Sequence, residues 1–205
     1  ELYADRYTPV EMMRTLREAS RHCYLLESAS QTEVWGRYSF LGYEPVMEIT
    51  CTDGIMKIRR TEGADKEEIT KQVAHPGDTL REILKEYKSP VMEDMPPFTG
   101  GLVGYFSYDY IKYSEPTLRL DAKDEEGFQD VNLMLFHKVI AFDNYRQKLI
   151  LITGVRLDGD LEENYENAQR ELEEMERLIR SGAKAVFKPL KLEEEFQPGA
   201  EKAEY

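Results

Sequence analysis

Two long apolar stretches in the second half of the chain restrict its fold more than any other feature. Val131–Phe142 and Lys148–Val155 run apolar or alternate with polar positions, and both contain β-branched side chains. Stretches of this kind are typical of strands inside a sheet. Only Asp143-Asn144-Tyr145-Arg146 separates them, which is a connection of hairpin length. The sequence therefore predicts two neighbouring strands here.

Further strands are predicted in the first third of the chain, at Cys23–Glu27, Tyr38–Gly42, Val46–Cys51 and Ile55–Arg59. The last two flank Asp53-Gly54, which is a strong hairpin signal. Because several connections are as short as a hairpin, the strands are expected to pair mainly antiparallel.

Three helices are predicted, over residues 9–21, 79–87 and 161–181. Thr8 can cap the first helix, Asp78 can cap the second, and Gly182 can stop the third. Residues 61–77 are polar and predict a surface loop. The order of helix, strands, helix, strands and helix favours an α+β fold, with mainly antiparallel β-sheet flanked by a few helices.

Charge and cysteine usage exclude several classes of partner. The 205 residues carry a net charge of −13, whereas nucleic acid and anionic membranes attract basic proteins. No apolar run of about 18 residues is present, so no transmembrane helix is expected. Cys23 and Cys51 are the only cysteines and form no CxxC pair, which makes a reducing cytoplasm the expected compartment.

Residues with obvious chemistry are sparse. The three histidines lie far apart in sequence and lack the spacing of a metal motif. Gly100–Gly104 invites comparison with a phosphate loop, but no Lys-Ser or Lys-Thr follows, so we expect a strand entry where glycines allow close backbone approach. In a strand that continues onward, Phe106, Tyr108 and Tyr110 would share one face. No catalytic residue and no metal ligand is predicted.

The end of the strand at Cys23–Glu27 raises a question of its own. Glu27 and Ser28 follow the apolar run directly, and Arg37 precedes the next strand. A carboxylate, a hydroxyl and a guanidinium are the groups needed to hold a free amino acid. The same residues also commonly cap a turn or lie on the surface, so from these residues alone both interpretations stay open.

Two blocks carry a resemblance to a known family. The first is Leu25-Leu26-Glu27-Ser28-Ala29 followed by Gly36-Arg37-Tyr38-Ser39-Phe40-Leu41-Gly42-Tyr43-Glu44-Pro45, and the second is Pro97-Phe98-Thr99-Gly100-Gly101-Leu102-Val103-Gly104-Tyr105-Phe106-Ser107-Tyr108-Asp109. Together they resemble anthranilate synthase component I, a chorismate-utilising family. The first block is specific to it, whereas the second is shared with related chorismate-using enzymes.

The resemblance implies a lyase of tryptophan biosynthesis that converts chorismate and ammonia to anthranilate and pyruvate. It also implies Mg²⁺ as cofactor, a glutamine amidotransferase subunit (component II) as the source of ammonia, and feedback inhibition by L-tryptophan. The residues implied for the feedback site are Leu26, Glu27, Ser28, Ala29 and Arg37.

Members of this family are about twice as long as this chain or longer, and their chorismate and magnesium ligands lie in the C-terminal half. Residues 1–205 are therefore expected to form the N-terminal regulatory domain, without the catalytic domain and inactive alone. Three alternatives remain: the same region of aminodeoxychorismate synthase component I from the folate pathway, a non-catalytic amino-acid-binding module, or an interaction surface for the amidotransferase or the catalytic half.

Overall fold

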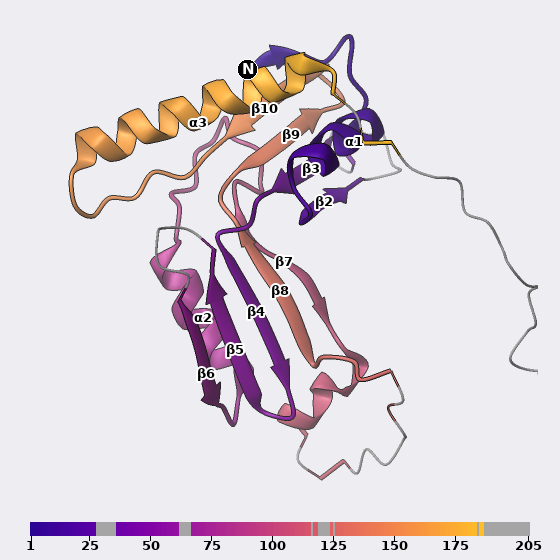
Figure 1. Ribbon diagram of the computed structural model, residues 1–205, viewed down its shortest axis with the longest axis vertical. Coiled ribbons are helices and arrows are strands. Elements are labelled where there is room, and N and C mark those ends of the chain that lie inside the picture. The colour runs from indigo at the N-terminus through magenta and orange to yellow at the C-terminus, as the bar shows by residue number, and fades with distance from the viewer. Residues whose placement is uncertain are drawn as a thin grey trace, which may run out of the picture.

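The computed structural model describes residues 1–27, 36–61, 67–115, 117–118, 124, 126–183 and 185–186. These residues form two five-stranded sheets in which every pairing is antiparallel. A few helices flank the sheets (Figure 1). The α+β class predicted from the sequence is confirmed.

The first sheet has the strand order β1-β10-β9-β3-β2 and the second has the order β6-β5-β4-β8-β7. The strands of the first sheet are Leu2–Tyr3 (β1), Cys23–Leu26 (β2), Tyr38–Tyr43 (β3), Val139–Asp143 (β9) and Lys148–Ile152 (β10). The strands of the second sheet are Met47–Thr52 (β4), Ile55–Arg60 (β5), Glu68–Gln72 (β6), Gly101–Phe106 (β7) and Val131–Phe136 (β8). The helices are Pro9–Ala19 (α1), Pro76–Glu86 (α2) and Leu161–Ser181 (α3), with a 3₁₀ helix at Tyr108–Tyr113 (η1).

The chain passes between the two sheets at two neighbouring points. The stretch Val131–Phe142, predicted as one strand, is two strands that belong to different sheets and are separated by His137 and Lys138. The second crossing follows β3, where Glu44 adopts a left-handed φ of 51°. Because β9 pairs with β3 and β8 pairs with β4, both paired segments leave one sheet and enter the other together.

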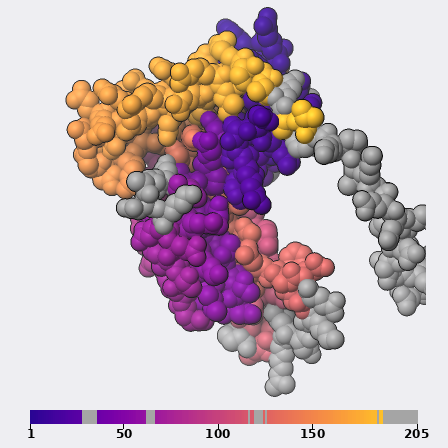
Figure 2. Space-filling model, viewed as in Figure 1, coloured from indigo at the N-terminus to yellow at the C-terminus, as the bar shows by residue number. Residues whose placement is uncertain are grey.

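The first sheet packs one face against α1 and α3. The side chains between them are almost fully buried, and they include Met12, Leu16, Leu41, Ile140, Phe142, Leu149, Met175 and Ile179. Thr8 caps α1 as predicted, by accepting a hydrogen bond from the Glu11 N–H. Gly182 ends α3 in a left-handed conformation with φ of 66°. Figure 2 shows α3, in orange, lying across the upper part of the molecule.

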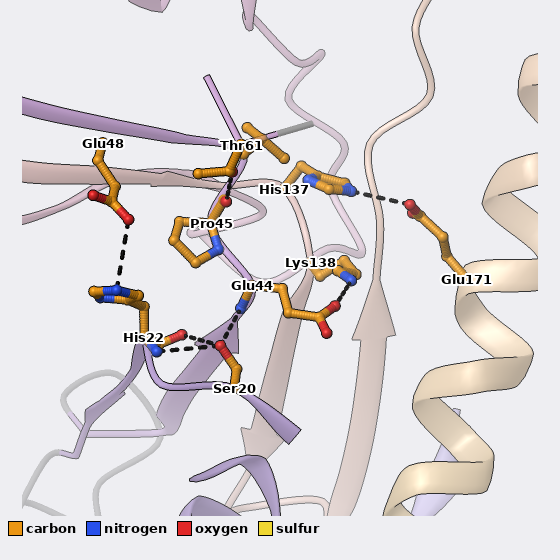
Figure 3. A pocket seen from close by; sticks show the side chains of 10 residues that line it. Ser20, His22, Glu44, Pro45, Glu48, Thr61, His137, Lys138 and Glu171 are labelled. Carbon is orange, nitrogen blue, oxygen red and sulfur yellow. Dashed lines mark hydrogen bonds and ion pairs between the residues drawn. The ribbon is translucent and has the colours of Figure 1, made fainter. Parts of the chain in front are cut away.

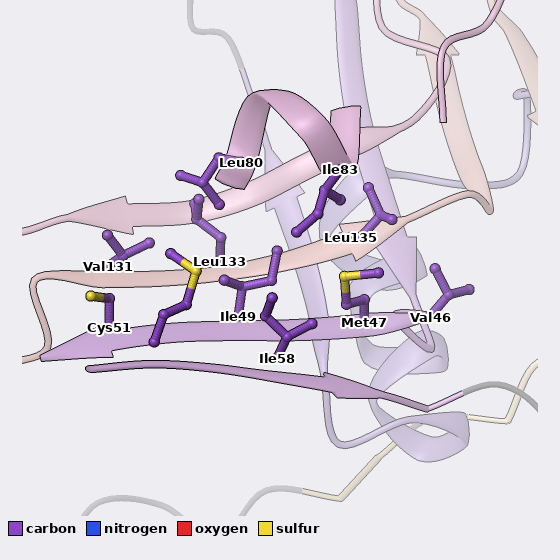
Figure 4. Packing of buried hydrophobic residues seen from close by; sticks show 11 residues of the cluster. Val46, Met47, Ile49, Cys51, Ile58, Leu80, Ile83, Val131, Leu133 and Leu135 are labelled. Atoms are coloured by element: carbon purple, nitrogen blue, oxygen red, sulfur yellow. The ribbon is translucent and has the colours of Figure 1, made fainter. Parts of the chain in front are cut away.

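The second sheet packs its inner face against α2. Leu80 and Ile83 of this helix point toward the strands, where they meet apolar residues of β4, β5 and β8 (Figure 4). Helix α2 starts at Pro76, earlier than predicted, because a proline is tolerated in the first helical turn. The prediction of a loop over residues 61–77 is wrong in part, since β6 lies within it as an edge strand with mostly exposed side chains.

The hairpin between β4 and β5 forms at the predicted position. Asp53 and Gly54 both have positive φ, at 48° and 77°, as a two-residue type I′ turn requires. Among the helices that the structure describes, none is long and apolar enough to cross a membrane.

Candidate functional site

The two described ends of the predicted feedback segment lie where β2 ends and where β3 begins, in neighbouring strands of the first sheet. Strand β2 ends at Leu26, which lies opposite Phe40 of the antiparallel strand β3. Glu27 follows as an exposed residue, and Leu26 is itself 49% exposed. Ser28 and Ala29 lie outside the described residues. Because β2 and β3 are neighbours, Glu27 and Arg37 belong to the same end of one strand pair.

Arg37 forms an ion pair with Asp143 at this end of the sheet. Its Nε lies 3.1 Å from Oδ1 of Asp143, and its Nη2 lies 2.6 Å from Oδ2 of the same carboxylate. The guanidinium carbon also lies 4.8 Å from the centre of the Tyr38 ring. The planar guanidinium and the planar carboxylate therefore meet in a bidentate arrangement that fixes the orientation of Arg37.

Asp143 is the buried member of this pair, with 2% of its surface exposed. It also accepts hydrogen bonds from the backbone N–H groups of Tyr145 and Arg146, at 3.2 and 2.9 Å. Burial alone would raise the pKa of Asp143, but the hydrogen bonds from Arg37 and Arg146 outweigh it and hold the pKa below its usual range. Asp143 is thus a charged anchor for Arg37 that also shapes the turn between β9 and β10.

Sequence reasoning assigned Asp143 to a turn and gave it no partner. Little in the sequence indicated a distant partner, because an Asp that follows a strand usually accepts hydrogen bonds only from backbone N–H groups of its own turn. The pairing of β3 with β9 places Tyr38 opposite Asp143, which brings Arg37 within reach of that carboxylate. This pairing could not be read from the sequence.

A pocket of about 440 Å³ lies where the chain crosses between the two sheets (Figure 3). Polar side chains that line it pair with one another. His22 Nε2 lies 3.6 Å from Glu48 Oε1, His137 Nε2 lies 3.2 Å from Glu171 Oε1, and Lys138 pairs with Glu44. The described feedback residues Leu26, Glu27 and Arg37 do not line it.

The pair of His137 and Glu171 connects α3 to the crossing after β8. Burial would raise the pKa of Glu171, but hydrogen bonds from His137 and Thr153 outweigh it and lower the pKa. Glu171 therefore stays ionised at neutral pH. The polar side chains of the pocket are paired with one another, which suits a structural junction better than a site for chemistry.

A second buried carboxylate, Asp130, organises the far end of the second sheet. Its Oδ2 accepts hydrogen bonds from Tyr113 Oη at 2.7 Å and from the Asp53 N–H at 2.8 Å, while its Oδ1 lies 2.8 Å from Lys112 Nζ. Tyr113 Oη in turn accepts from the Gly54 N–H at 2.7 Å. Burial would raise the pKa of Asp130, but these partners lower it. The network fastens η1 to the hairpin of β4 and β5.

The glycine-rich block is a strand, as expected, and not a phosphate loop. Gly104 has φ of 154°, and a Cβ placed on it would lie 2.0 Å from the carbonyl oxygen of Asn132 in β8. The glycine therefore allows β7 to lie close to β8. The predicted aromatic face is wrong in part, because the chain turns into η1. The rings of Phe106 and Tyr110 meet edge to face with their centroids 4.8 Å apart, but Tyr108 is 89% exposed.

Comparison with known proteins identifies the family. The sequence profile described as chorismate binding enzyme matches residues 21–205, which is most of the chain. The chain belongs to the chorismate binding enzyme family.

Relatives of this chorismate binding enzyme carry a consistent name. Anthranilate synthase component 1 of Acinetobacter calcoaceticus is 36% identical over 180 residues, which cover 86% of this chain and 35% of the relative. The protein of the same name from Acetivibrio thermocellus is 30% identical over 179 residues, which cover 87% of this chain and 35% of the relative. The chain thus spans about 35% of the length of these curated relatives.

A solved structure supports the fold. The crystal structure of anthranilate synthase component I from Streptococcus pneumoniae TIGR4 aligns with a TM-score of 0.50 and 24% sequence identity, over 86% of this chain and 36% of that chain. The resemblance to anthranilate synthase component I that the two sequence blocks indicated is confirmed.

Across the described ranges, no group of three or more His, Cys, Asp or Glu side chains is arranged to hold a metal ion. The described residues therefore do not fit the Mg²⁺ that the family resemblance implies.

Proposed function

We propose that this chain is the N-terminal, tryptophan-sensing part of an anthranilate synthase component 1. The complete enzyme would convert chorismate and ammonia, released from glutamine, to anthranilate and pyruvate. The names of the relatives support the reaction. The observation that carries the sensing role is that Leu26 and Glu27 are exposed at the end of β2, at the same end of the strand pair at which the anchored Arg37 precedes β3.

The proposed feedback site would hold L-tryptophan by complementary groups. The carboxylate of Glu27 can accept hydrogen bonds from the ammonium group, and the hydroxyl of Ser28 can donate one to the carboxylate. The half-exposed side chain of Leu26 offers an apolar surface to the indole ring. Ala29 lies beside these residues in the sequence and is assigned to the same site.

Arg37 would add positive charge near the ligand carboxylate. Its hydrogen bonds to Asp143 neutralise part of that charge but also hold the guanidinium in one place. An anchored cation loses less conformational freedom when a ligand binds than a mobile one does. Arg37 therefore contributes mainly by position, and Asp143 supports it.

Feedback inhibition would arise from a shift between two states of the enzyme. An inhibitor that binds one state better than the other moves the population toward that state by its differential affinity. Typical allosteric coupling amounts to about 1–3 kcal/mol. Tryptophan bound at the edge of the first sheet would thus act at a distance from the chemistry.

The chemistry would belong to the part of the enzyme that this chain does not match. We assign the chorismate and Mg²⁺ ligands to that part, and an amidotransferase subunit, component II, would supply ammonia. This chain, given chorismate, ammonia and Mg²⁺, is expected to produce no anthranilate fluorescence. Turnover by this chain would place the active site within it and refute the assignment.

The product of the complete enzyme distinguishes anthranilate synthase from the aminodeoxychorismate synthase of the folate pathway. The enzyme reconstituted with the remaining portion of a relative is expected to release anthranilate. Release of 4-amino-4-deoxychorismate would favour the folate enzyme instead.

A further inference from the structure

Asn144 lies opposite Arg37, one residue beyond the end of the pairing between β3 and β9. The last paired residues of these strands are Tyr38 and Asp143. The backbone N–H of Asn144 then donates a hydrogen bond to the carbonyl oxygen of Arg37 at 2.8 Å. This bond extends the contact between the two chain segments to Arg37, which directly precedes β3.

The side chain of Asn144 makes a second contact with the same segment. Its Nδ2 donates a hydrogen bond to Oγ of Ser39 at 3.2 Å, and Ser39 is only 1% exposed. Loss of a hydrogen bond to a buried hydroxyl is costly, because the hydroxyl is shielded from water. Asn144 therefore holds the start of β3 on both sides of Tyr38, by its backbone at Arg37 and by its side chain at Ser39.

The rest of the turn between β9 and β10 fixes Asn144 in turn. Asp143, directly before it, accepts hydrogen bonds from the backbone N–H groups of Tyr145 and Arg146. Gln147 Nε2 donates a hydrogen bond to the Asn144 carbonyl oxygen at 2.7 Å. A turn that is already ordered in this way loses little conformational entropy when a ligand binds beside it.

Contacts of two kinds thus converge on Arg37. Asp143 orients its guanidinium through the bidentate ion pair, and Asn144 holds its backbone. The direction in which a long side chain reaches a ligand depends on where its backbone starts as well as on where its end is held. Because hydrogen bonds weaken steeply when donor and acceptor are misaligned, a shift of the Arg37 backbone would weaken the contact of its guanidinium with a ligand.

We infer that Asn144 is a positioning residue of the proposed feedback site, which sets the affinity for the ligand carboxylate by holding the backbone of Arg37. This inference rests on the proposed function, in which Arg37 supplies positive charge near that carboxylate. Asn144 acts through Arg37 and does not itself bind the ligand. Its loss therefore weakens recognition of the carboxylate, whereas recognition of the ammonium group and of the indole ring stays the same.

The test is calorimetric titration of this chain and of Asn144→Ala with L-tryptophan and with L-tryptophanamide. The amide keeps the ammonium group and the indole ring but lacks the carboxylate. Asn144→Ala is expected to raise the Kd for tryptophan by ~5- to 10-fold and to change the Kd for tryptophanamide by less than ~2-fold. A merely structural role would loosen the whole site and weaken the binding of both ligands alike.

A double-mutant cycle shows whether Asn144 acts through Arg37. In an Arg37→Gln background, Asn144→Ala is expected to change the Kd for tryptophan by less than ~2-fold, because the group that it positions is absent.

A matched control and a second variant complete the set. The side-chain amide of Asn164 donates to the carbonyl oxygens of Arg156 and Asp158 at 3.1 and 2.7 Å near the start of α3, so Asn164→Ala should leave both Kd values unchanged. Ser39→Ala removes the contact with Asn144 from its other partner and should give the same selective loss as Asn144→Ala. Urea unfolding midpoints report whether each variant is folded.

Three results would overturn the inference while a tryptophan site remains. These are tryptophan binding that folded Asn144→Ala and Ser39→Ala leave unchanged, equal weakening for tryptophan and tryptophanamide, or a loss of the same size in the Arg37→Gln background. Absence of tryptophan binding by the parent chain is a different outcome, because it would refute the proposed function and the inference with it.

Discussion

Replacing Asp143 with Asn tests the anchor of the candidate site. The substitution preserves size and can keep acceptors for the N–H groups of Tyr145 and Arg146, but it removes the charge that Arg37 faces. Removal of one partner from a buried ion pair costs about 3–5 kcal/mol. The Arg37 side chain is 25% exposed, so water can solvate the freed guanidinium and we expect a loss of about 2–3 kcal/mol.

The loss is measured by urea unfolding followed by circular dichroism at neutral pH. With an m-value of about 2 kcal/mol/M, the midpoint should fall by roughly 1–1.5 M. Asp158→Asn is the control, because Asp158 pairs with Arg156 on the surface, where both side chains are about two-thirds exposed. That variant should leave the midpoint unchanged.

The stability difference between the parent chain and Asp143→Asn should depend on pH with a definite sign. The pKa of Asp143 is lower in the folded state than in the unfolded chain, so its ionised form stabilises the fold above the unfolded pKa of about 3.9. This contribution is lost as the pH falls through the folded pKa. The gap between the parent chain and Asp143→Asn should therefore be full at pH 7 and close below about pH 4. A gap that is absent at pH 7, or equally large at pH 3, would refute the reasoning.

Three further substitutions test the rest of the fold by urea unfolding. Gly104→Ala should lower the free energy of unfolding by about 3–5 kcal/mol, because it adds a clash with β8 to backbone strain. The control Gly159→Ala, at a glycine with φ of 71° and open space around it, should lower it by only about 1–2 kcal/mol. Equal losses in the two variants would contradict the close approach of β7 to β8. Tyr113→Phe should cost about 1–3 kcal/mol by removing the hydroxyl between Asp130 and the turn N–H, and an unchanged midpoint would show that the network carries no stability. Thr8→Ala should cost about 1 kcal/mol through the lost helix cap, and Thr8→Ser should restore most of it.

Local signals predicted the local elements well. Asp53-Gly54 places a turn that needs two positive φ values, and only a few residue types adopt them readily. The amphipathic stripe and terminal Gly182 define α3 with the predicted bounds. In each case the information lies within a few neighbouring residues, so one sequence is enough.

Long-range pairing could not be predicted in the same way. The apolar pattern runs through His137 and Lys138 without a turn residue, so the transfer of the chain from one sheet to the other was missed. Strand β6 was missed because an exposed edge strand has little apolar periodicity. Both features depend on which strands become neighbours, which local propensity does not encode.

In the candidate site, too, the local features were predicted and the long-range contact was not. The polar end of β2 and the strand β3 that follows it were predicted, and the structure shows that these two strands pair. The partner of Arg37 was not predicted, because Asp143 lies 106 residues away in the sequence. The assignment of Leu26, Glu27, Ser28, Ala29 and Arg37 to a feedback site remains a prediction.

Calorimetric titration of this chain with L-tryptophan tests the central claim most directly, with Ser28→Phe as the disabled variant and Ser20→Ala, a hydroxyl loss at the pocket between the sheets, as the control. The account predicts saturable binding by the parent chain and by Ser20→Ala, and loss of binding in Ser28→Phe. Absence of binding by the parent chain, or binding that Ser28→Phe leaves unchanged, would contradict the claim that residues 26–29 form a tryptophan sensor.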